Sequence, residues 1–117
     1  MPSTQYPAPT GTNQNAAADN AAATATHAGA AGEFLEVTHL DASFSAAGVV
    51  KLVTLKDNAS SPVTYWQGYT SGGSLNVDLV PPIKIADTKS AVAVLAASGT
   101  GGTIGSINCV AVRRRAT

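Results

Sequence analysis

The stretch from Ser90 to Arg113 constrains the fold more than any other part of the chain. It holds two apolar runs, SAVAVLA and INCVAV, joined by a connection with glycines at positions 99, 101, 102 and 105. In each run residues alternate between two faces, and glycines lie between the runs, which predicts a β-hairpin. Because both faces of each run are apolar or small, we expect this pair of strands to lie inside a sheet, covered by the remaining strands.

The residues between positions 33 and 89 have the same β character. They predict strands at 33–45, 49–56, 63–69 and 75–80 and a short edge strand at 83–85, separated by turns rich in Gly, Pro, Asn and Ser. Pro81 and Pro82 are expected to end the strand before them. These short strands indicate an all-β fold, a small antiparallel sandwich or a jelly-roll-like barrel.

Two of these strands allow side chains to be assigned to faces. In LNVDLV, strict alternation predicts that Leu75, Val77 and Leu79 face the core. In EFLEVTHLDASFS, alternation places Leu35, Val37 and His39 on one side and Leu40 on the other, with a bulge expected near Asp41.

The first 32 residues differ in composition from the rest. Prolines stand near the start, and the tract from Asn13 to Ala31 has no Leu, Ile, Val or Phe with which to dock on a core. We therefore predict an extended N-terminal arm over residues 1–32 that lies on a partner, and a β-domain over residues 33–117 that ends in a short basic tail. The arm is expected to contact the partner through Tyr6, Pro7, Pro9, Asn13 and Asn15.

Charge and cysteine content exclude several classes of protein. The chain has seven Lys and Arg, seven Asp and Glu and a formal net charge of zero, so we expect neither nucleic-acid nor membrane partners. A single cysteine, Cys109, allows no internal disulfide, which favours synthesis in a reducing cytosol. Neither a signal peptide nor an apolar run long enough to span a membrane is expected.

The sequence offers no pattern typical of catalysis or cofactor binding. The glycines after position 98 are not followed by the helix that a dinucleotide fingerprint requires. His27, His39 and Cys109 lack metal-ligand spacing, and no serine lies in a nucleophile motif. We therefore predict a protein without enzymatic activity, without a cofactor and without a metal ion.

Aromatic and basic residues are the remaining candidates for partner binding. Tyr65, Gln67 and Tyr69 are expected to share one strand face, with Trp66 on the other. Burial in the core or in an oligomer interface is favoured for this face; if exposed, it would stack on a sugar or on protein. Arg113, Arg114 and Arg115 form the one charge run, which predicts a solvated tail or a protein contact.

With this layout, the chain resembles small capsid decoration or cement proteins of tailed double-stranded DNA bacteriophages. The resemblance rests on the N-terminal MPSTQYPAPTGTNQNAAADNAAATATHAGAAG, on LDASFSAAGVVKLVTLKD and on AASGTGGTIGSINCVAV. It implies a structural protein of the virion that binds the outer surface of the capsid and reinforces it. The implied partners are the major capsid protein and further copies of the chain, with a trimer favoured.

An alternative follows from the same layout. A β-domain with an N-terminal arm also suits a tail, baseplate or head-fibre module that binds a host-surface glycan or protein. In either case the protein is expected to be made in the host cytoplasm and to function in the virion.

Overall fold

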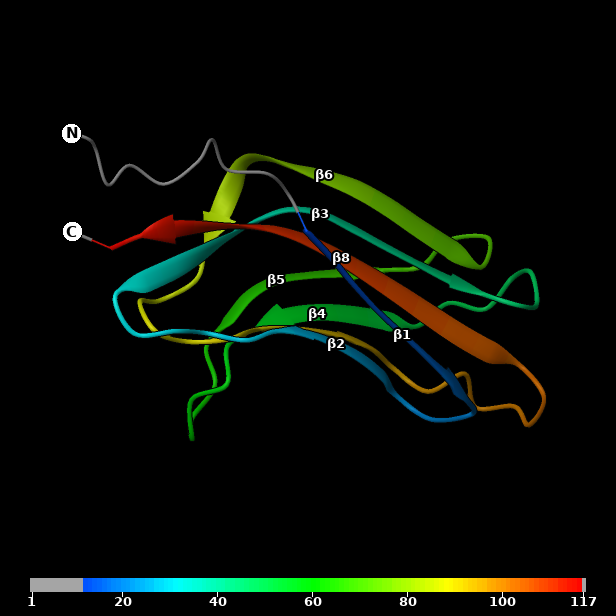
Figure 1. The fold of residues 1–117 in the computed structure, drawn as a ribbon. Helices are drawn as coiled ribbons and strands as arrows, with labels where there is room; N and C mark the ends of the chain where they lie inside the picture. The colour runs from blue at the N-terminus through cyan, green and yellow to red at the C-terminus, as the bar shows by residue number, and fades with distance from the viewer. Residues whose placement is uncertain (1–11, 117) are drawn as a thin grey trace.

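The computed structural model describes residues 12–116 and shows two antiparallel sheets packed face to face (Figure 1). The strands are β1 (Thr12–Asp19), β2 (Ala23–His27), β3 (Glu33–Phe44), β4 (Leu52–Lys56), β5 (Thr64–Tyr69), β6 (Ser74–Lys84), β7 (Ala91–Leu95) and β8 (Ile104–Arg115). Sheet A has the strand order β1-β8-β3-β6 and sheet B the order β2-β7-β4-β5. The predicted all-β antiparallel sandwich is confirmed.

The hydrophobic core lies between the two sheets. Alternate residues of each strand point inward, and most of the large inward side chains are almost fully buried. The fully buried residues with the largest side chains are Leu35, Leu40, Leu55, Ile85, Leu95, Ile107, Val37, Val53, Thr70 and Cys109. The assignment of Leu75, Val77 and Leu79 to the inner face is confirmed, since these side chains pack against the core.

The N-terminal region forms two strands of the sandwich, contrary to the predicted arm. β1 pairs with β8 along its whole length, and β2 pairs with β7. Ala23 and Ala25 are each 2% exposed, opposite Leu95 and Ala93 of β7. Residues 12–27 form strands without large apolar side chains because β8 and β7 supply their backbone hydrogen bonds. The prediction of an arm considered only the composition of this segment and not its pairing partners.

The domain boundary at residue 32 is therefore wrong for residues 12–32. The prediction of an arm now applies only to residues 1–11. Tyr6, Pro7 and Pro9 lie outside the described residues.

The predicted hairpin between β7 and β8 is also wrong. The two strands belong to different sheets, and the glycine-rich connection passes from one sheet to the other (Figure 1). Gly99 and Gly102 adopt φ angles of 83° and 85°, which other residues rarely adopt. The edges of β7 are already paired with β2 and β4 and those of β8 with β1 and β3, so each strand lies inside its sheet as expected.

β6 continues through the two prolines that were expected to end it. Val37 of β3 pairs with Ile83, and His39 pairs with Asp78, so four residues of β6 lie opposite the single residue Thr38. Pro81 and Pro82 fall within this irregular segment of an edge strand, where no ladder donor is needed from them.

Two strand ends differ from the predictions, one because of side-chain contacts and one because of strand pairing. β4 begins at Leu52 and not at residue 49, because the Thr70 hydroxyl donates to the Val49 carbonyl and accepts from the Lys51 amide. The last arginines form no tail, since β8 extends to Arg115 and pairs there with β3.

Candidate functional site

The outer face of sheet A is polar across all four strands. Cross-strand pairing aligns its side chains in rows perpendicular to the strands. We call this surface the polar face of sheet A; it consists of Asn13, Asn15, Ala17, Ser106, Asn108, Val110, His39, Asp41, Ser43, Ser74, Asn76 and Asp78. It includes Asn13 and Asn15, which were expected to contact a partner from an arm.

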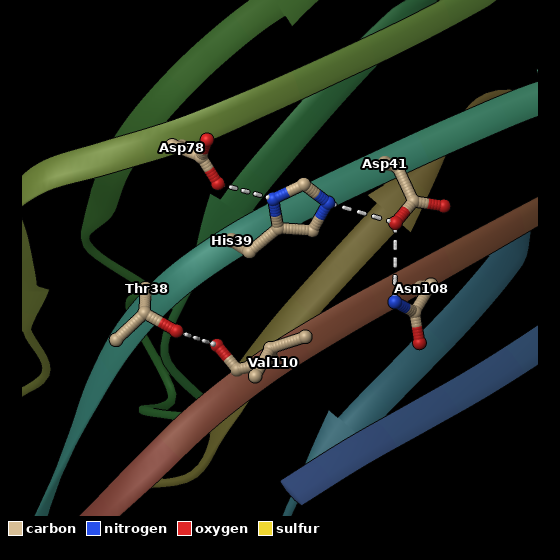
Figure 2. Close-up of polar contacts among 6 residues, drawn as sticks. All are labelled: Thr38, His39, Asp41, Asp78, Asn108 and Val110. Atoms are coloured by element: carbon tan, nitrogen blue, oxygen red, sulfur yellow. Dashed lines mark hydrogen bonds and ion pairs between the residues drawn. The ribbon is translucent and has the colours of Figure 1, made fainter. Parts of the chain in front are cut away.

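A bulge in β3 produces this face. Thr38 is the additional residue between Val37 and His39, and its hydroxyl donates to the Val110 carbonyl at 3.4 Å (Figure 2). The extra residue reverses the alternation, so that Val37 and Leu40 are both buried while His39 points outward. The predicted grouping of His39 with Val37 is therefore wrong, and the bulge expected near Asp41 lies at Thr38.

His39 forms the centre of a polar network on this face (Figure 2). Its Nδ1 donates to Asp78 Oδ1 at 2.7 Å and its Nε2 to Asp41 Oδ2 at 3.0 Å. The hydrogen bond to Asp78 raises the pKa of His39, partial burial opposes this shift, and Asp41 adds to it. In its protonated form the imidazole donates from both nitrogens, and the ring then links β3 to β6 as a cation between two carboxylates.

A depression of about 340 Å³ lies beside this network on the polar face. Its lining comes from β1, β3 and β8 and consists of Asn15, Ala16, Ala17, Asp41, Ser43, Ser106, Ile107 and Asn108. Asn108 Nδ2 donates to Asp41 Oδ2 at 3.1 Å, so the network continues into the wall of the depression.

The outer face of sheet B has a different composition. We call it the apolar face of sheet B; it consists of Thr24, Thr26, Val92, Val94, Leu52, Thr54, Lys56, Gln67 and Tyr69. Only one of these residues, Lys56, carries a charge. Val92, Val94 and Leu52 are half-buried, and Tyr69 is 63% exposed.

The two tyrosines expected to share a face have different environments. β5 is irregular at Tyr65, since Leu55 pairs with Trp66 and Lys56 with Thr64. The Tyr65 hydroxyl donates to Asp57 Oδ2 at 3.3 Å and accepts from the Ala86 amide at 3.1 Å. Tyr65 therefore fixes local structure, and Tyr69 remains as the exposed aromatic residue of this strand.

The arginine run is largely paired within the chain. Arg113 Nη1 lies 3.2 Å from Glu33 Oε1, and Arg113 Nη2 donates to the Ala28 carbonyl at 2.7 Å. Arg114 Nε pairs with Glu36 Oε1. These contacts join the end of β8 to the start of β3, so the arginines are not an isolated basic surface.

His27 and Cys109, which are distant in sequence, meet in the core. His27 is 4% exposed, and its Nε2 donates to the Cys109 carbonyl at 2.8 Å, which links sheet B to sheet A. Burial raises the pKa of the Cys109 thiol to about 12. Cys109 is 0% exposed and packs in the core as a small side chain.

Sequence reasoning missed Asp41, Asp78, Asn108, Ser43 and Ser106 as members of one site. They come from β3, β6 and β8, and only the sheet register brings them together. The alternation of polar residues with buried ones in SINCV and HLDAS is the local signal that they share an outward face.

Residues 12–116 contain no group of three or more His, Cys, Asp or Glu side chains placed to hold a metal ion. Over the same part of the chain, no helix has the length and apolar character that crossing a bilayer requires. No protein-family model matches the chain, and a search of curated proteins found no match.

Proposed function

We propose that the protein is a non-enzymatic structural component of a phage virion that binds the outer surface of the capsid as a decoration or cement protein. The apolar face of sheet B is the observation that carries this proposal. It is a sheet surface of Val, Leu, Thr, Gln and Tyr side chains with a single charge, Lys56, and it suits contact with another protein.

The area of this face is smaller than a stable protein interface requires, so binding to the capsid needs further contacts. Four strands spaced by about 4.8 Å and about five residues long cover roughly 300 Å². A stable interface buries about 800 Å² on each partner. Residues 1–11 precede β1 and span at most about 40 Å when extended, so we propose that they supply additional contacts, through Tyr6, Pro7 and Pro9.

Binding linkage explains how such a protein would reinforce a shell. A ligand that binds assembled capsid and not free subunits stabilises the assembled state in proportion to its affinity and concentration. Association of several copies, for which we propose a trimer, adds avidity without any new type of contact.

The test is co-sedimentation of the purified chain with expanded capsids of the phage that encodes it, together with the temperature at which those capsids release DNA. We expect the wild-type chain to bind and to raise this temperature. Thr54→Lys places a charge at the centre of the apolar face and is expected to abolish binding, because the lysine would lose water in the interface. Deletion of residues 1–11 is expected to weaken binding.

Asn76→Lys is the matched control, since it adds the same charge to the polar face of sheet A. Binding by this variant together with loss of binding by Thr54→Lys would support the proposal. Equal binding by both variants, or binding to purified tails and not to heads, would contradict it. A deletion of residues 1–32 is unsuitable, because it removes β1 and β2 from the sandwich.

A further inference from the structure

We infer that the depression on the polar face of sheet A is a binding site for a neutral saccharide. This surface is on the side of the sandwich opposite the apolar face of sheet B, so the inference is independent of the capsid proposal. Three features support it: the shape of the depression, the free hydrogen-bonding atoms at its wall and the local charge.

The shape follows from the register of sheet A. Ala17, Ser106 and Ser43 are aligned across β1, β8 and β3 and form a low row. The adjacent row contains the longer side chains of Asn15, Asn108 and Asp41 and forms a wall. The resulting volume of about 340 Å³ is within the range of small-ligand sites.

The wall presents a fixed carboxylate. Asp41 Oδ2 accepts from His39 and from Asn108, and the side chain is 40% exposed. The other oxygen of Asp41 and the amide oxygen of Asn108 point away from these contacts (Figure 2). Because the carboxylate is held from one side, its second oxygen is available to accept from a ligand hydroxyl in a charge-assisted hydrogen bond.

The local charge selects the class of ligand. The network contains two carboxylates and the His39 imidazole, and the lining of the depression includes the Asp41 carboxylate but no Lys, Arg or His. An anion in the depression would be repelled by Asp41, and no basic side chain of the lining would bind it. A neutral polyol donates to Asp41 and accepts from the Asn15 amide, and its C–H surface packs against the methyl group of Ala17.

The experiment is a ¹⁵N-HSQC titration of the full chain with the methyl glycosides of glucose, galactose, mannose and N-acetylglucosamine, and with inorganic phosphate. We expect at least one glycoside to shift the amide signals of residues 15–17, 41–43 and 106–108, and phosphate to shift none of them. Ala17→Leu fills the depression from an exposed position without removing a hydrogen bond, and Asp41→Asn removes the charge. Each variant is expected to weaken binding at least about tenfold, the equivalent of about 1.4 kcal/mol.

Asn76→Ala is the control, because Asn76 lies in the same row as Asp41 but outside the depression. Unchanged affinity in this variant, with weaker binding by Ala17→Leu, supports the site. The inference is overturned if no glycoside shifts these signals, if the shifts occur around Tyr69, or if Ala17→Leu binds as the wild type does. Capsid binding by Ala17→Leu is expected to be normal, which separates this result from the capsid proposal.

Discussion

The two outer faces of the sandwich differ although the sheets are built in the same way. Each sheet has four antiparallel strands, and each contributes its alternate residues to the common core. The outward residues of β8 include Ser106 and Asn108, whereas those of β7 are Val92 and Val94. Inward residues thus form the common core, and outward residues determine the chemical character of each face.

The largest expected effect is the loss of stability when a core leucine of either sheet is shortened, and it tests whether the two sheets differ only on their outer faces. Leu40 of sheet A and Leu55 of sheet B are both 0% exposed. Leu40→Ala and Leu55→Ala should each lower the free energy of unfolding by about 2–5 kcal/mol, because each leaves a cavity in the shared core. Urea unfolding measures the free energy of unfolding of each variant. If only one of the two substitutions lowers it, the sheets do not share one core.

The two histidines allow the stability contribution of a buried side chain, His27, to be compared with that of a side chain on the outer face, His39. His27→Ala removes a buried hydrogen bond between the sheets and should cost about 1–3 kcal/mol. His39→Ala removes ion pairs at the surface and should cost less than about 1 kcal/mol. The same unfolding measurement compares them, and a greater loss for His39→Ala would contradict this ranking.

Charges added to either outer face should leave stability almost unchanged. Thr54→Lys and Asn76→Lys are each expected to change the free energy of unfolding by about 0.5 kcal/mol or less, because neither removes a core contact. Thermal unfolding followed by circular dichroism checks this. If Thr54→Lys unfolds the domain, its loss of capsid binding says nothing about the apolar face, and Tyr69→Lys takes its place.

The smallest expected effect is a pH dependence that belongs to sheet A alone. The pKa of His39 is raised in the folded protein, so its contribution to stability is fully present below its unfolded value of about 6.5. This contribution is lost as the pH rises through the higher folded pKa. The stability difference between wild type and His39→Gln should therefore shrink from pH 6 to pH 9. An unchanged difference would show that the ring is not protonated in the folded state.

Most residues of the candidate site could not be predicted from the sequence to lie together. Asn13 and Asn15 were singled out, but as parts of an arm and not of a sheet. His39 was placed on one side with Leu35 and Val37, whereas its neighbours Asp41, Asp78 and Asn108 come from three strands and were not grouped with it. The bulge at Thr38 turns His39 and Asp41 of β3 outward, and no local pattern marks its position.

The sequence alone determined the all-β class, the approximate positions of most strands after residue 32 and the inward residues of several of them. Alternation and turn residues are local properties, so they are visible without a structure. The tertiary structure decided that residues 12–27 are strands and that β7 and β8 belong to different sheets. Strand pairing joins residues that are far apart in the chain, such as Thr12 and Ala111, and local composition does not encode it.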